Sequence, residues 1–158
     1  MAKNVKTNVM RLLDGAKIPY QDHCYVESGV VSGVDVARVL NQPPERVFKT
    51  LVTRGAGKAY YVFVVPVEKE LDLKKAAKAV GEKSIAMIHA KELLPLTGYI
   101  HGGCSPIGMK KFFTTTVDES AKAQETICVS AGKIGYQVEL APADLEKMIP
   151  LTYADITA

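Results

Sequence analysis

The stretch RVFKTLVTRGAGKAYYVFVVPV, residues 46–67, decides the fold class. Two runs rich in β-branched and aromatic residues flank a Gly-Ala-Gly turn, a pattern typical of a β-hairpin. Lys49 lies inside the first run, on the strand face that it shares with Val47 and Leu51. Burying an unpaired ammonium group in an apolar core is costly. We therefore expect Lys49 to face a cleft in which a ligand supplies its partner.

The rest of the chain alternates between helical and strand patterns. Asn4, Ser32 and Asp72 are candidate helix N-caps. Helices are predicted at residues 4–15, 33–40, 73–80, 91–94 and 142–148, and further strands at residues 18–26, 84–88, 112–117, 126–130 and 136–140. A hairpin mixed with single helices does not fit a doubly wound parallel sheet. The sequence therefore predicts an α+β fold, a mixed, barrel-like β-sheet flanked by helices.

Length and composition limit the possible classes of protein. With 158 residues, 47% of them hydrophobic, the chain is expected to form one domain over residues 1–158. The N-terminal region lacks the apolar stretch of a signal peptide, and no run approaches the roughly 20 apolar residues of a membrane span. We therefore expect a cytoplasmic protein without a membrane partner. A net charge of +3 is too small to predict DNA binding by charge alone.

The cysteines and histidines do not predict a metal site. The chain has three residues of each kind, with neither C-x-x-C nor H-E-x-x-H spacing. The cysteines are therefore expected to be free thiols, and no metal or other cofactor is expected.

A second informative stretch is the glycine-rich segment GYIHGGCSPIG, residues 98–108. Glycines allow backbone conformations that are closed to other residues and let the main chain approach a ligand closely. The amides of Gly102 and Gly103 could form a cradle for a carbonyl oxygen or an anion. The spacing differs from that of the nucleotide-binding loops, and a purely structural tight turn is the alternative.

Four motifs together resemble the YbaK/EbsC family. They are FKTL at residues 48–51, LKKA at 73–76, the glycine-rich segment with its continuation MKK to residue 111, and VSAGK at 129–133. Their order and spacing match over nearly the whole chain. The resemblance implies a barrel-like mixed sheet and a trans-editing deacylase that removes cysteine mischarged on tRNA(Pro), with Cys-tRNA(Cys) as a further candidate substrate. The implied partners are the 3′ end of the aminoacyl-tRNA and prolyl-tRNA synthetase.

The same resemblance implies the roles of individual residues. The catalytic residues would be Lys49 and Gly102, the latter through its main-chain N–H. The implied substrate-binding residues are Tyr25, Thr50, Gly103, Ser105, Pro106 and Ser130. Relatives carry an acidic or small polar residue at the position of Gln137, which leaves the pocket role of this glutamine open. In the implied reaction, the thiol of the substrate cysteine attacks its own ester carbonyl, so the enzyme needs no nucleophile.

Three alternatives stay open from the residues alone. Cys104 could be a nucleophile, because it lies in the glycine-rich segment with His101 nearby, although no orienting acid is evident. The chain could instead be a noncatalytic module that binds an aminoacyl or nucleotide end. It could also be a free-standing deacylase for another mischarged tRNA, such as Ala-tRNA(Pro).

Overall fold

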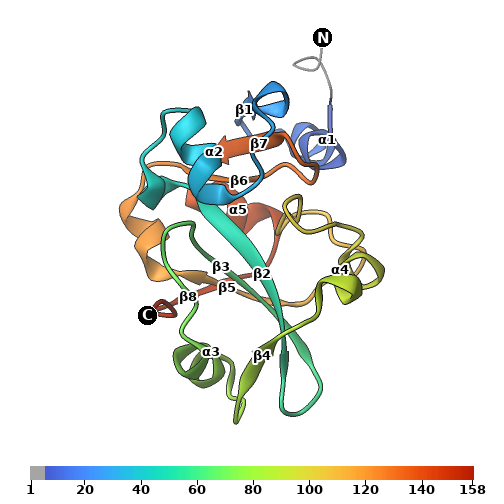
Figure 1. Ribbon diagram of the computed structural model, residues 1–158, viewed down its shortest axis with the longest axis vertical. Helices are drawn as coiled ribbons and strands as arrows, with labels where there is room; N and C mark the ends of the chain where they lie inside the picture. The colour runs from blue at the N-terminus through green and yellow to red at the C-terminus, as the bar shows by residue number, and fades with distance from the viewer. Residues whose placement is uncertain (1–5) are drawn as a thin grey trace.

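The computed structural model describes residues 6–158 (Figure 1). Its α-helices are α1 (Asn8–Gly15), α2 (Gly33–Val39), α3 (Leu73–Val80), α4 (Ala90–Thr97) and α5 (Pro142–Met148). Its strands are β1 (Gln21–Cys24), β2 (Phe48–Gly55), β3 (Tyr60–Pro66), β4 (Ile85–Met87), β5 (Thr114–Asp118), β6 (Ile127–Ser130), β7 (Tyr136–Leu140) and β8 (Thr152–Ala154). Short 3-10 turns are η2 (Val26–Ser28), η3 (Pro44–Arg46) and η4 (Glu119–Ala123).

The strands form two sheets. A mixed five-stranded sheet has the order β4-β2-β3-β5-β8, in which β5 runs parallel to both β3 and β8. A smaller antiparallel sheet has the order β1-β7-β6. A single parallel bridge between Val47 and Cys128 links the two sheets. The predicted α+β class with a mixed sheet is confirmed, but the strands are divided between two sheets and do not close into a barrel.

The predicted hairpin is confirmed as β2 and β3. The Gly55 N–H donates to the Ala59 carbonyl at 2.8 Å, which closes the turn between the two strands. The Glu82 carboxylate stabilises this turn, since it accepts hydrogen bonds from the Gly57 N–H at 3.1 Å and from the Tyr61 hydroxyl at 2.6 Å. Because β3 is covered on both faces, its apolar run is continuous and does not alternate with polar residues.

Local caps explain where two of the helices begin. The Ser32 hydroxyl accepts a hydrogen bond from the Asp35 N–H at 3.2 Å, so Ser32 caps α2 as predicted. The cap predicted at Asn4 lies outside the described residues. Helix α1 begins at residue 8, where the Thr7 hydroxyl accepts a hydrogen bond from the Met10 N–H at 3.2 Å.

The main core joins α1, both sheets and α5, with Leu13, Val64, Val138 and Leu145 among its fully buried members. Strand β4 pairs with β2 only at residues 53–55. Within residues 6–158, the edge of β2 that faces away from β3 therefore has no strand partner at residues 48–51. No helix in the described part is both long and apolar enough to cross a membrane.

Candidate functional site

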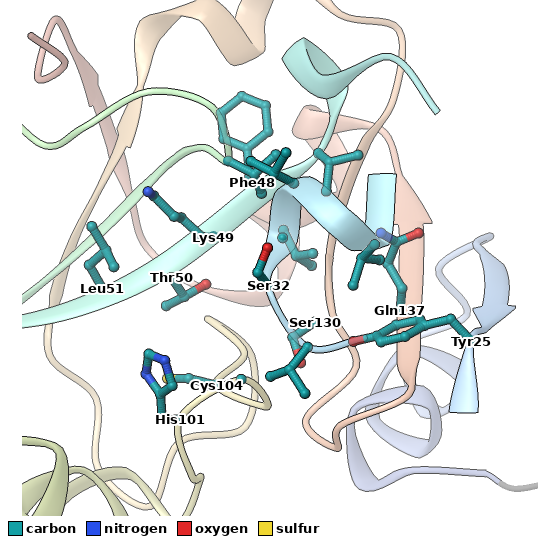
Figure 2. A pocket seen from close by; sticks show the side chains of 18 of the residues that line it. Tyr25, Ser32, Phe48, Lys49, Thr50, Leu51, His101, Cys104, Ser130 and Gln137 are labelled. Carbon is teal, nitrogen blue, oxygen red and sulfur yellow. The ribbon is translucent and has the colours of Figure 1, made fainter. Parts of the chain in front are cut away.

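A cavity of about 550 Å³ lies at this open edge of β2. Its walls come from β2, the segment leading into α2, the glycine-rich loop, and the facing ends of β6 and β7 (Figure 2). Of the residues predicted from the sequence, the cavity is lined by Tyr25, Lys49, Thr50, Gly102 and Ser130. The fold thus gathers side chains from segments that are more than 100 positions apart.

Lys49 is half-buried in the cavity wall. Its ammonium group makes no hydrogen bond or ion pair with any residue that the structure describes. No carboxylate belongs to the described lining of the cavity. A cation without a protein partner in a concave site is well placed to bind a negatively charged group of a ligand.

Thr50 lies on the opposite side of β2 from Lys49 (Figure 2). Its hydroxyl oxygen is buried and has no hydrogen-bond partner among residues 6–158. A buried hydroxyl without a partner is costly, and it is compensated when a ligand supplies the hydrogen bond. The Thr50 hydroxyl is therefore a second unpaired polar group of the cavity.

Gly102 occupies a position that requires glycine. Its φ is +88°, and a Cβ built there would lie 2.5 Å from Cγ1 of Val31. The neighbouring Gly103 N–H donates to the Ile100 carbonyl at 3.0 Å, whereas no such bond engages the Gly102 N–H within the described chain. The expected cradle of two amides is therefore reduced to one available donor, at Gly102.

The other three residues predicted from the glycine-rich segment lie outside the cavity lining. Gly103 packs against backbone, since a Cβ there would lie 3.1 Å from the nitrogen of Ile134. Ser105 is fully buried, and its hydroxyl accepts a hydrogen bond from the Ile107 N–H at 3.2 Å. Pro106 lines a separate cavity. These three residues therefore do not belong to the cavity lining, and the substrate contacts expected of them stay predictions.

Tyr25 and Ser130 form a hydroxyl-bearing part of the wall. Figure 2 shows the Tyr25 hydroxyl directed toward Ser130. Burial raises the pKa of the Tyr25 phenol, which keeps it protonated at neutral pH. The Ser130 oxygen accepts a hydrogen bond from the Gly132 N–H at 3.1 Å, so its own hydrogen is left for another acceptor.

Gln137, whose role the sequence left open, also lines the cavity, and only 3% of it is exposed. Its amide pairs with that of Gln42 through two hydrogen bonds. Gln42 Nε2 donates to Gln137 Oε1 at 2.8 Å, and Gln137 Nε2 donates to Gln42 Oε1 at 3.2 Å. Sequence reasoning missed Gln42, because no local pattern signals a side-chain pair across 95 positions.

The geometry argues against Cys104 as a nucleophile. Burial raises the pKa of its thiol to about 12, so almost no thiolate exists at neutral pH. His101 also lines the cavity, but no hydrogen bond between it and Cys104 is present in the described chain. Cys104 therefore fills space in the wall.

One group of side chains has the composition of a metal site. Among the described residues, ligand atoms of His23, Cys128 and Glu139 lie within 4.8 Å of one another. His23 Nε2 is already 2.8 Å from a Glu139 oxygen, and the Thr126 hydroxyl donates to the other oxygen. The guanidinium of Arg46 lies 4.0 Å from the same carboxylate and disfavours a second cation. This group is therefore a network of polar side chains around the Glu139 carboxylate, outside the cavity.

Comparison with known proteins identifies the class. Residues 27–148 match the family model of the aminoacyl-tRNA editing domain, and the chain belongs to this family. The resemblance to the YbaK/EbsC family is confirmed by EbsC of Enterococcus faecalis, which carries the provisional name Cys-tRNA(Pro)/Cys-tRNA(Cys) deacylase. The two proteins are 47% identical over 153 residues, which cover 96% of this chain and 93% of EbsC.

More distant relatives share the fold or a part of the sequence. A crystal structure described as a candidate trans-editing enzyme for prolyl tRNA synthetase superposes with a TM-score of 0.81 at 20% identity, covering 98% of this chain and 99% of that chain. Because its identity is this low, it supports the fold alone. A proline–tRNA ligase of Thermosipho africanus is 33% identical over 76 residues, which cover 48% of this chain and 13% of the ligase.

Proposed function

We propose that the chain is a free-standing aminoacyl-tRNA deacylase that removes cysteine from Cys-tRNA(Pro), with Cys-tRNA(Cys) as a further substrate. The match to EbsC over nearly its full length supports this assignment. The observation that carries it is the unpartnered ammonium of Lys49 in a cavity that no carboxylate lines among the described residues. Residues 1–158 act as one editing domain in the cytoplasm, alongside prolyl-tRNA synthetase.

The proposed reaction uses the thiol of the substrate as the nucleophile. The sulfur forms a bond to the ester carbonyl carbon, the carbon–oxygen bond to the ribose breaks, and the thiol proton ends on the ribose oxygen. The products are a cyclic thiolactone and free tRNA. No cofactor is required, because the substrate supplies the attacking group and holding it in an attacking geometry provides much of the acceleration.

Two groups of the site stabilise the charge that develops in this reaction. The Gly102 N–H donates a hydrogen bond to the carbonyl oxygen as it becomes negative. The Lys49 ammonium binds the terminal nucleotide, whose phosphate is negative and whose ribose oxygen gains negative charge as it leaves. The Thr50 hydroxyl, which has no hydrogen-bond partner within residues 6–158, forms a hydrogen bond with the bound aminoacyl group.

Selectivity for cysteine then follows from chemistry more than from shape. A free thiol has a pKa of about 8.5, whereas the hydroxyl of serine is far less acidic. Serine is therefore a poor internal nucleophile even where it fits the cavity. Alanine has no internal nucleophile, so water would have to attack Ala-tRNA(Pro).

The decisive experiment compares tRNAs charged with cysteine, serine, alanine and proline, with the released product identified by mass. We expect rapid release of thiolactone from the cysteine-charged tRNAs and from none of those charged with serine, alanine or proline. Direct formation of free cysteine would contradict the internal attack. Faster release from Ala-tRNA(Pro) would identify an alanine editor, and no release from any tRNA would identify a binding module.

Substitution of Lys49 provides the matched test of the site. Lys49→Ala should lower single-turnover deacylation by about 100-fold or more, because the stabilising charge is lost. Lys83→Ala is the control, since Lys83 is exposed and lies outside the cavity lining. Adding prolyl-tRNA synthetase should raise the preference for tRNA(Pro) over tRNA(Cys), and an unchanged preference would contradict the proposed partnership.

A further inference from the structure

The proposed reaction needs a group that takes the proton from the substrate thiol, and the cavity offers one candidate. His101 is exposed and lies in the cavity wall, directly before Gly102 in the glycine-rich loop. Its ring makes no hydrogen bond or ion pair with the part of the chain that the structure describes. Figure 2 shows the ring on the same side of β2 as Thr50.

The other titratable groups that line the cavity cannot accept this proton at neutral pH. They are Tyr25, Lys49 and Cys104. A protonated phenol, an ammonium group and a buried, protonated thiol are all acids under these conditions. Histidine is the side chain that ordinarily changes its charge between pH 5 and 8, and its neutral ring has a free acceptor nitrogen.

Resting on the proposed function, we infer that His101 is a catalytic residue, the general base that deprotonates the thiol of the bound cysteine. The free ring nitrogen of His101 takes the thiol proton and forms a thiolate–imidazolium pair. The thiolate attacks the ester carbonyl, the ribose oxygen leaves, and the imidazolium returns the proton to that oxygen. Atoms and charges balance without any further reactant.

The position of His101 suits this step. Gly102 places its N–H at the carbonyl oxygen, and the ring of the preceding residue enters the same cavity. The Lys49 ammonium favours the thiolate that forms. Because the ring is exposed and unpartnered within the described residues, it is free to turn toward a thiol once the substrate is bound.

The inference predicts a particular dependence of rate on pH. Without a base, attack depends on the fraction of free thiolate, which for a thiol of pKa about 8.5 is about 1% at pH 6.5, about 10% at pH 7.5 and half at pH 8.5. With His101 as the base, the rate should depend less steeply on pH over this range. His101→Gln should therefore slow single-turnover deacylation by tens of fold at pH 6.5, by about tenfold at pH 7.5 and by about twofold at pH 8.5.

The experiment measures Cys-tRNA(Pro) deacylation from pH 6 to 8.5 for the wild type, for His101→Gln and for the control His89→Gln, after subtraction of spontaneous hydrolysis. His89 is also an exposed histidine, and it lies outside the cavity lining. Added imidazole should restore part of the rate of His101→Gln at pH 7, with imidazole alone as the blank. Thermal unfolding of His101→Gln should be unchanged, since the exposed ring of His101 makes no hydrogen bond or ion pair with residues 6–158.

The outcomes separate the two proposals. A wild type that does not deacylate Cys-tRNA(Pro) contradicts the proposed function itself. If the wild type is active and His101→Gln has the same pH profile, His101 is not the general base, and the proposed deacylase function still stands. If His101→Gln lowers the deacylation rate equally at every pH and imidazole does not restore it, His101 is again not the general base. Its role would then be substrate binding.

Discussion

The substitution Gly102→Ala tests the geometry of the glycine-rich loop most directly. An alanine at φ +88° costs about 1–2 kcal/mol in backbone strain. Its Cβ would also lie 2.5 Å from Cγ1 of Val31, and the half-exposed Val31 side chain can turn aside at small cost. For a domain of this size, the strain should lower Tm by about 3–6 °C. Relieving it by a change of φ would turn the amide away from the carbonyl oxygen, and loss of one such donor costs about 100-fold in rate.

The assay pairs thermal unfolding with single-turnover deacylation of Cys-tRNA(Pro) at saturating enzyme. Val31→Ala in the Gly102→Ala background removes the overlap but not the strain, so it should recover a minor part of Tm and little of the rate. If Gly102→Ala lowers Tm as expected and the rate stays within twofold, the amide does not stabilise the oxyanion. If Tm does not fall, the positive φ at this residue is wrong.

Three further predictions concern other parts of the molecule. Cys104→Ser should keep the deacylation rate within about threefold, because burial holds the thiol pKa at about 12, and an inactive variant would restore Cys104 as nucleophile. Gln42→Leu should lower the free energy of unfolding in urea by about 1–3 kcal/mol, because it leaves the buried Gln137 amide without its hydrogen-bond partner. Replacing both glutamines by leucine should lower the free energy of unfolding by less. Burial would raise the pKa of Glu139, but hydrogen bonds from neighbouring side chains outweigh it and hold that pKa below the usual 4.5. Its stabilisation is therefore complete above about pH 5 and lost as pH falls through the lowered pKa, so Glu139→Gln should flatten the acid side of a plot of urea midpoint against pH.

Local signals predicted the elements that surround the site. The Gly-Ala-Gly turn between two β-rich runs defined the hairpin, and Asp72 followed by apolar helical spacing defined α3, whose predicted bounds match the structure. The pairing of β1 with β7 joins residues more than 100 positions apart, and no turn signal encodes it. The division into two sheets was therefore beyond sequence reasoning, as was strand β8 near the C-terminus.

The candidate site shows the same limit at the level of single residues. Lys49 stood out because a charge interrupted an apolar strand, and the structure places it in the cavity wall. Ser105 and Pro106 belong to the same motif as Gly102, but membership of a motif does not say which residues face the cavity. The Gly103 N–H donates its hydrogen bond to the Ile100 carbonyl inside the turn. This bond depends on the backbone conformation, which the sequence alone does not reveal.

The open edge of β2 has a consequence for the behaviour of the protein in concentrated solution. A strand edge with unpaired main-chain groups can template pairing with a strand of another molecule, and lysine on such an edge is a common safeguard against aggregation. Lys49 stands on this edge. Exchanging it for an apolar residue would remove the positive charge of the cavity wall and a barrier to self-association at once, so preparations of such a variant should be checked for soluble oligomers before their activity is compared.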